Sequence, residues 1–185
     1  MFFENDDIAS IHTLAGAARE IYEKHCGHTG VDRMFDYFKS AHPGKSEKEI
    51  WNTLNGIRNF LKHPDPSYDL AAEVELDDQT NAAMLFVACF DCAMLCGEAM
   101  PVEVQAFNVW FPLTQLPPST DLPGDISSLD AGEADPLEHR FPELRSASMG
   151  VRKRFGRELL RVAKTGDDLN WPPHDQTEHE RRGKR

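Results

Sequence analysis

The sequence predicts an all-α fold: an antiparallel four-helix bundle with an extra C-terminal helix. Apolar residues recur at helical spacing through the first hundred residues. The predicted helices are joined by short connections, which favour antiparallel neighbours. The alternation of polar and apolar residues that marks strands is not evident anywhere. The chain has 185 residues, of which 40% are hydrophobic, and this is enough for one domain with a real core.

Two helices are expected before residue 45. The first spans residues 6–25, and its apolar stripe consists of Ile8, Ile11, Ala15, Ala18 and Tyr22. The second is short and carries Met34, Phe35 and Phe38. Thr29 and Asp32 precede it with the spacing of a capping box, so we expect them to begin it.

Three further helices are expected before residue 116. Ser46 and Glu49 form a capping box that begins a helix, which Pro64 must end near residue 63. Asp77 and Asp78 precede a long helix that ends at about Gly97. Residues 82–96 of this helix are apolar almost all round, which predicts the most buried element of the fold. A short helix is expected over residues 101–115.

Composition divides the chain into four parts. Residues 5–115 form the helical bundle, 116–136 an acidic linker rich in Pro and Gly, 137–165 a basic amphipathic helical segment, and 166–185 a disordered tail. The helical segment has a basic stripe formed by Arg154, Arg157, Arg161 and Lys164, beside apolar Phe155, Leu159 and Val162. We expect its apolar side to dock on the bundle. The alternatives are contact with RNA, a membrane surface or a protein partner.

Charge and composition exclude several classes of protein. The net charge of -11 excludes a generally basic nucleic-acid-binding surface, although not a local basic site. The first residues lack the pattern of a signal peptide, and no apolar stretch reaches the length of a membrane span. The longest such stretch, Ala82 to Phe90, is followed directly by Asp91. We therefore expect a cytoplasmic protein without a membrane partner.

The helix over residues 46–63 has an unusual polar face. Its apolar arc, which we expect to face the core, consists of Ile50, Leu54, Ile57 and Leu61. The opposite side carries Trp51, Asn55, Arg58, Asn59, Lys62 and His63. Arginine, lysine and histidine together suit a phosphate, because they offer a planar fork, a point charge and a proton acceptor. The alternative is a solvated helix face whose C-terminal histidine interacts with the helix dipole.

The segment from Arg58 to His63 resembles the R-x4–6-H motif of the HEPN domain family. The residue after the arginine is often Asn, Asp or His in that family, and Asn59 fits. The opening helix, from Ile8 to Ala18, also resembles the first helix of some bacterial HEPN-like proteins. The resemblance covers about residues 6–100. A second match, Arg19 to His25, has Glu20 after its arginine, which is a poor neighbour for a phosphate.

The resemblance implies a metal-independent endoribonuclease of the toxin or defence type, with no cofactor. Active members are commonly homodimers, so Arg58 and His63 would be catalytic across the dimer interface. Asn59 and Lys62 would orient the phosphate. The same face holds Asn55, while Trp51 would anchor the interface or stack on a base, and His12 would line the site. The implied partners are an RNA substrate and an antitoxin or another protein.

Other interpretations stay open at this point. The chain could be a non-catalytic dimeric interaction module that uses the Trp51–Lys62 face. Nucleotide binding without hydrolysis fits the same donors but lacks a Gly-rich phosphate loop. His12 is more simply a hydrogen-bonded histidine at the edge of the core. Three cysteines share one face of the long helix, and we expect them to pack as small apolar groups rather than bind a metal with His25, Cys26 and His28. They are Cys89, Cys92 and Cys96.

Overall fold

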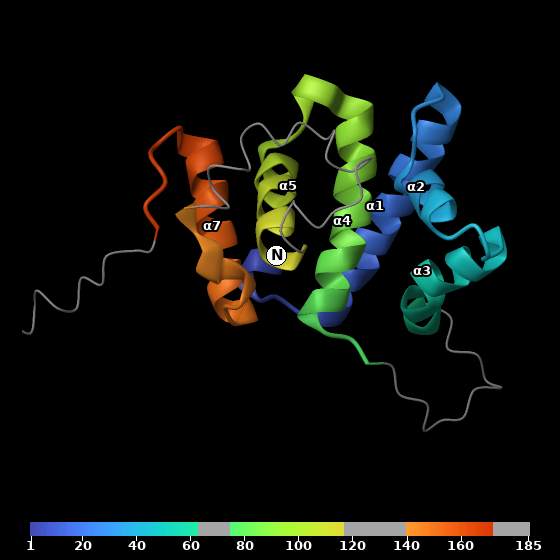
Figure 1. The fold of residues 1–185 in the computed structure, drawn as a ribbon, viewed down its shortest axis with the longest axis horizontal. Coiled ribbons are helices and arrows are strands. Elements are labelled where there is room, and N and C mark those ends of the chain that lie inside the picture. Colours follow the sequence, from blue (N-terminus) through green and yellow to red (C-terminus); the bar gives the residue numbers. More distant parts are fainter. Residues whose placement is uncertain (63–74, 117–139, 172–185) are drawn as a thin grey trace, which may run out of the picture.

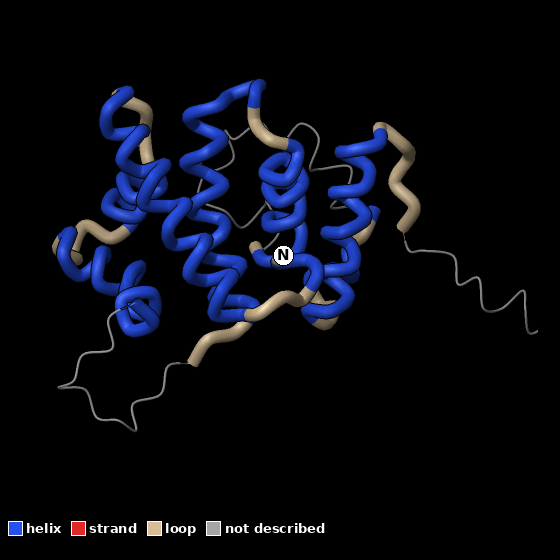
Figure 2. The backbone as a smooth tube through the Cα atoms, turned by 180° about the vertical axis from the view of Figure 1, so that it is seen from behind, coloured by secondary structure: helices blue, strands red, loops and turns tan. Residues whose placement is uncertain are grey.

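The computed structural model describes residues 1–62, 75–116 and 140–171. These residues form six α-helices and short 3-10 turns, and no strand occurs among them (Figure 2). The predicted all-α class is therefore confirmed. The elements in chain order are η1 (Phe2–Glu4), α1 (Ile8–Thr29), α2 (Met34–Ala41), α3 (Glu47–Lys62), α4 (Asp78–Cys96), η2 (Gly97–Ala99), α5 (Val102–Gln115), η4 (Pro142–Arg145) and α7 (Met149–Thr165).

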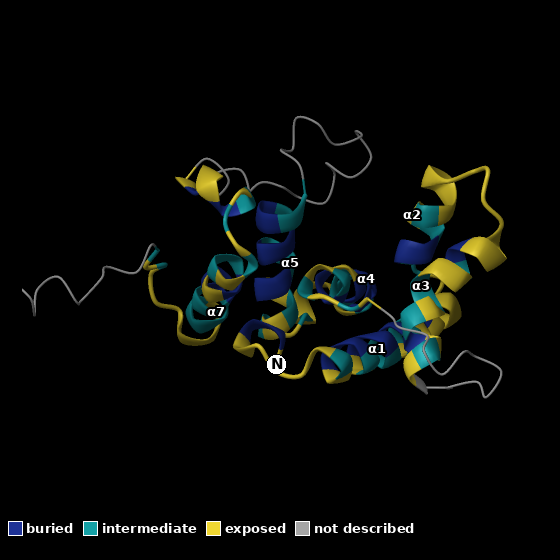
Figure 3. Ribbon diagram, turned by 90° about the horizontal axis from the view of Figure 1, so that it is seen from below, coloured by how far each residue is buried: buried dark blue, intermediate teal, exposed yellow. Residues whose placement is uncertain are grey.

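The helices follow one another across the molecule. Figure 1 shows α7, α5, α4 and α1 in that order, with α2 and α3 beyond α1. The most extensive contact is between α1 and α4, and α5 lies between α4 and α7. Helix α3 packs on α1 and α2. Figure 3 shows α5 as largely buried, whereas α2 and α3 carry more exposed residues.

Local capping signals explain where most helices begin. The Asp7 carboxylate accepts a hydrogen bond from the Ser10 amide at 2.7 Å at the start of α1. The predicted capping box before α3 is present, because the Ser46 amide donates to Glu49 Oε2 at 2.7 Å. Asp77 caps α4 through the Thr80 amide, also at 2.7 Å. These bonds satisfy amides that a helix N-terminus leaves without partners.

The predicted start of α2 is wrong. Helix α1 continues to Thr29, whose hydroxyl donates back to the carbonyl of His25 at 3.0 Å. Gly30 then ends α1 with a φ of 72°, a left-handed conformation that glycine adopts without strain. The capping residue of α2 is Arg33, whose amide donates to Asp36. Thr29, which was expected to begin the second helix, is therefore the last residue of a longer α1.

The main core is an aromatic cluster on α5. Trp110 is fully buried, and its ring meets those of Phe2 and Phe3 at 5.3 Å between centroids. Phe155 and Leu159 of α7 belong to the same cluster. The indole N–H of Trp110 donates to the carbonyl of Arg152 at 2.6 Å. Helix α7 thus docks on the rest of the protein through its apolar side, as we expected for the basic segment.

Helix α4 is the central element of the fold. It is the one candidate for a membrane span in the described part of the chain, as judged by length and hydropathy. It lies between α1 and α5, and its Asn81 and Asp91 are buried among protein partners. This position is compatible with the core helix of a soluble protein.

Several predictions fall outside the described residues. They include most of the linker over residues 116–136, the helix stop at Pro64, and the tail beyond residue 171. The first part of the expected tail is described, and it differs from the prediction. Trp171 packs its ring edge against Phe155 at 5.2 Å between centroids. The aromatic side chain extends the core to residue 171, so residues 166–171 are not a free tail.

Candidate functional site

Part of the polar side of α3, formed by Trp51, Asn55 and Arg58, faces α1 rather than solvent. Arg58 was expected on an exposed face but is only 4% exposed, while Leu61 of the expected core arc is exposed. Helix α1 makes this orientation possible through Gly16, where an added Cβ would lie 2.5 Å from Cδ of Arg58. A glycine at this position lets the arginine stem lie directly on the backbone of α1.

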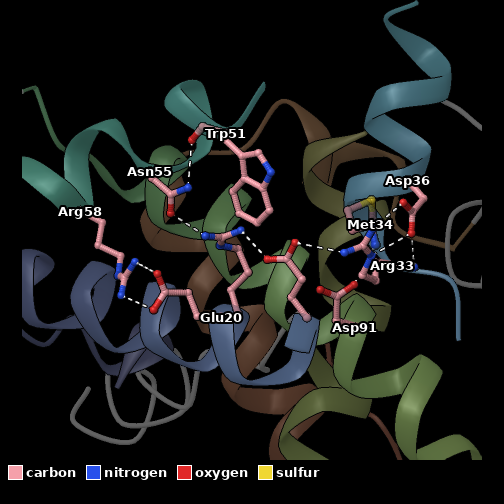
Figure 4. A network of polar contacts seen from close by, with 10 residues as sticks. Glu20, Arg33, Met34, Asp36, Trp51, Asn55, Arg58 and Asp91 are labelled. Atoms are coloured by element: carbon pink, nitrogen blue, oxygen red, sulfur yellow. Dashed lines mark hydrogen bonds and ion pairs between the residues drawn. The ribbon is translucent and has the colours of Figure 1, made fainter. Parts of the chain in front are cut away.

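The guanidinium of Arg58 is bound by a carboxylate. Both of its terminal nitrogens donate to the two carboxylate oxygens of Glu20 on α1, in the parallel geometry that arginine and carboxylate prefer (Figure 4). The Glu20 side chain is 39% exposed, so water still reaches the pair from one side. Nε of Arg58 is buried and has no hydrogen-bond partner among the described residues. The fork that was expected to bind a phosphate is therefore occupied within the chain.

A second arginine, Arg19, organises the neighbouring part of α3. It is fully buried, and it donates to Asn55 Oδ1 at 2.5 Å and to Glu23 Oε2 at 3.2 Å. Its guanidinium also lies 5.1 Å from the ring centre of Trp51, a cation–π contact. The indole also stacks on Phe35 of α2, with 4.7 Å between the ring centroids. Trp51 and Asn55 thus serve an internal arginine.

The network continues from α1 to α2 and α4. Arg33 forms two hydrogen bonds to the Asp36 carboxylate, at 2.9 and 2.8 Å, and lies 3.8 Å from Glu23. Asp91 of α4 accepts the amide of Met34 at 2.8 Å. Together with the contacts of Arg19 and Arg58 between α1 and α3, these interactions, shown in Figure 4, connect four helices through charged groups.

Burial sets the electrostatics of the network. Desolvation raises the pKa of Glu23 and of Asp91, and it lowers the pKa of Arg19. The nearby arginines oppose this effect on both carboxyl groups. Sequence analysis missed the roles of Arg19, Glu23 and Asp91. The signal for Asp91 was present, since a carboxylate directly after a long apolar stretch needs a buried partner.

His12 lies on the inner side of α1 and is 1% exposed. Its Nδ1 is 3.0 Å from Oδ1 of Asn81, and Nδ2 of that asparagine donates to the carbonyl of Ile8 at 2.9 Å. Desolvation lowers the pKa of His12, the Asn81 hydrogen bond partly offsets this, and the charge of Arg58 lowers it further. The structure thus places this histidine in the core, bound to a neighbouring helix.

The remaining predicted site residues are dispersed or undescribed. Asn59 is exposed on α3. Helix α3 ends at Lys62, whose side chain lies outside the described part of the structure, as does His63. The structure therefore brings Trp51, Asn55 and Arg58 against α1, where α1 residues occupy them. It leaves the predicted pairing of Arg58 with His63 as a prediction.

The cysteines are distributed between core and surface. Cys26 and Cys92 are buried, Cys89 is partly buried and Cys96 is exposed. Burial raises the pKa of Cys89 to about 12, which keeps this group a thiol at neutral pH. Within the described ranges, no group of three or more His, Cys, Asp or Glu side chains is arranged to hold a metal ion.

Comparison with known proteins found no matching family model, no matching curated protein and no matching solved structure.

Proposed function

We propose that this protein is a non-catalytic helical interaction module, in which α1 binds α1 of a second copy of the chain. The observation that carries the proposal is an apolar stripe on the solvent side of α1. Leu14 is 54% exposed and Ile21 is 56% exposed. They are seven positions apart, about two helical turns, which places both on the same side of the helix, with Ala17 between them. We call Leu14, Ala17 and Ile21 the α1 stripe.

The α1 stripe is complementary to itself in an antiparallel arrangement. A two-fold axis between residues 17 and 18 would bring Leu14 against Ile21 of the partner subunit, and the reverse contact would follow by symmetry. The small side chain of Ala17 lies near that axis and permits close approach of the two helices. Large side chains at both ends and a small one at the centre suit packing of two like helices.

Charge supports the same arrangement. Exposed Asp6 and Asp7 precede α1, whereas Lys24, His25 and His28 lie exposed near its end. An antiparallel pair would place the acidic end of each helix near the basic end of its partner. A parallel pair would instead bring like ends together. The antiparallel dimer is therefore the arrangement that we propose.

The non-catalytic part of the proposal rests on Arg58. A guanidinium that is buried and held by both oxygens of Glu20 would have to leave this carboxylate before it could stabilise a phosphate. Trp51 and Asn55 are similarly bound to Arg19. Trp51, Asn55 and Arg58 of this face are thus engaged inside the chain, which favours α1 as the contact surface.

The test is the oligomeric state of the full chain, measured by light scattering coupled to size-exclusion chromatography. We expect wild type to have twice the chain mass of 20.9 kDa. Leu14→Glu and Ile21→Glu should each give the monomer, because they place a carboxylate in an apolar contact. Gln79→Glu adds the same charge at an exposed position on α4 and should leave the dimer intact.

A double variant tests the register. Leu14→Glu combined with Ile21→Lys should restore the dimer, since the antiparallel pairing sets each new carboxylate against a new ammonium of the partner. A monomeric wild type would contradict the proposal, as would a dimer that neither single glutamate weakens. A double variant that stays monomeric would contradict the antiparallel register.

Metal-independent RNA cleavage by a HEPN-like bundle is the second candidate. It is favoured by the position of Arg58 and the exposed Asn59 in the second half of α3, directly before the long apolar α4. The test is incubation of wild type, Arg58→Ala and His63→Ala with total RNA in EDTA. Cleavage by wild type alone would support this candidate and contradict the non-catalytic module. Intact RNA with all three folded proteins would exclude it.

A further inference from the structure

A pocket lies between α3 and α4, and its wall also includes His12 of α1. Its volume is about 420 Å³, within the range of about 300–1,000 Å³ that is usual for small-molecule sites. The wall is mainly apolar, with Leu54 and Ile57 from α3, Met84 and Val87 from α4, and Phe111 from α5. The partly solvent-facing arc of α3, expected to close a core, forms one side of this pocket.

The pocket wall contains three polar residues, and the hydroxyl groups of two of them already donate hydrogen bonds to protein acceptors. Thr53 donates its hydroxyl proton to the carbonyl of Glu49 at 3.0 Å. Thr80 donates to Asp77 Oδ1 at 2.7 Å. The third residue is His12, and the pocket wall includes no charged side chain among the described residues.

Hydrogen bonds fix the tautomer of His12. Asn81 donates its Nδ2 to the carbonyl of Ile8, so its Oδ1 is the atom that faces the imidazole. Oxygen Oδ1 can only accept, and Nδ1 of His12 must therefore carry the proton. In the neutral ring, Nε2 then presents a lone pair. This Nε2 is buried and has no hydrogen-bond partner in the part of the chain that the structure describes.

We propose that the pocket binds a small, neutral, largely apolar molecule that carries one hydroxyl or comparable donor. A shift of the wall side chains would uncover the buried Nε2 of His12, and the ligand would donate a hydrogen bond to this nitrogen. The apolar wall provides the contact area, and the single acceptor orients the ligand. A carboxylate ligand is disfavoured because it has no proton to donate to the Nε2 lone pair and would lose its hydration in a mainly apolar wall. The pocket is separate from the α1 stripe, so the two proposals can fail independently.

Naphthalene derivatives provide matched probes. The ligand 1-naphthol has the required donor, 1-methoxynaphthalene has the same ring system without it, and 1-naphthoate carries a negative charge. Binding to the full chain is measured by calorimetry and by ligand-observed NMR. We expect 1-naphthol to bind wild type about tenfold more tightly than the methyl ether, and naphthoate to bind more weakly than the naphthol.

Two variants separate the acceptor from the cavity. His12→Phe keeps an aromatic ring of similar size and removes Nε2, so naphthol and ether should bind it equally. Ala83 is an exposed residue of the pocket wall. Ala83→Trp should fill the opening and abolish binding of both probes. Ala99→Trp, at an exposed alanine outside the pocket, is the matched control and should bind as wild type does.

Circular dichroism verifies the fold of each variant. If His12→Phe does not fold, the comparison of naphthol with its ether on wild type and on Ala83→Trp still decides the question. Equal affinity of wild type for naphthol and ether would overturn the proposed role of His12. Undiminished binding to Ala83→Trp would overturn the location, and no binding of any probe at about 1 mM would overturn the proposal.

Discussion

At the scale of single residues, the Arg58–Glu20 ion pair has the largest bearing on function. If the pair stabilises the fold, substitutions of its two members should change the unfolding free energy by different amounts. Glu20→Gln leaves a buried guanidinium without its counter-charge and should cost about 3 kcal/mol of unfolding free energy. Arg58→Met keeps the stem over Gly16, and the part-exposed Glu20 carboxylate stays within reach of water, so it should cost less than about 1.5 kcal/mol.

Urea unfolding of the two variants measures this difference directly. Lys48→Met, on an exposed part of α3, controls for the loss of a surface cation. A Glu20→Gln protein as stable as wild type would show that the pair does not support the fold. Arg58 would then be free to act on a ligand, which would favour the second candidate function.

His12 should make stability depend on pH. Burial lowers its pKa below the ordinary 6.5, so near pH 6 the unfolded chain holds a proton that the folded chain does not. This contribution to the unfolding free energy is therefore complete above pH 6.5 and is progressively lost as the pH falls. His12→Gln keeps a donor for Asn81 but does not titrate.

The measurement compares the unfolding free energies of wild type and His12→Gln at several values between about pH 7.5 and pH 5. As the pH falls, the unfolding free energy of wild type should decrease relative to that of His12→Gln. Glu23 and Asp91 have raised pKa values and act in the opposite direction at lower pH, but they are common to both proteins. A constant difference would contradict a buried neutral imidazole.

At the scale of elements, helix α7 contains two glycines whose substitution by alanine should change the stability of the protein in opposite directions. A Cβ at Gly156 would lie 2.3 Å from Cε1 of Phe3, whereas a Cβ at Gly150 would meet nothing within 4 Å. Gly156→Ala should therefore cost about 1–3 kcal/mol by displacing Phe3. Gly150→Ala should stabilise the protein by about 0.5–1 kcal/mol through helix propensity. Thermal unfolding compares the two, and equal effects would contradict the packing of η1 on α7.

Elements are also the scale at which sequence prediction succeeded most. The starts of α3 and α4 were predicted from local signals, Ser46 with Glu49 and Asp77 with Asp78, because a cap depends on residues within three positions of one another. The buried face of α3 was not predictable in this way. It depends on Glu20 and Gly16, which lie far away in sequence, and a helical wheel assigns arginine to solvent whatever its partner.

The whole molecule should unfold as one unit, since α7 shares its core with η1 and α5. Phe155 is fully buried against Phe141 and Trp171. Phe155→Ala should cost about 3–5 kcal/mol and lower hydrogen-exchange protection in α5 as well as in α7. Exposed Tyr37→Ala should have a smaller effect. Loss of protection confined to α7 would show that this helix is an appendage and not part of the domain.

The contact of α7 with η1 has a consequence for synthesis on the ribosome. Arg157 donates to the carbonyl of Phe3 at 2.6 Å across a sequence separation of 154 residues. At about 5–20 residues per second, the interval between making these two residues is about 8–30 seconds. Throughout that time the nascent chain holds Phe2 and Phe3 without the helix that covers them, and later Trp110 as well. Translation that stops before α7 would release a chain with an open aromatic surface, the kind of segment that chaperones bind.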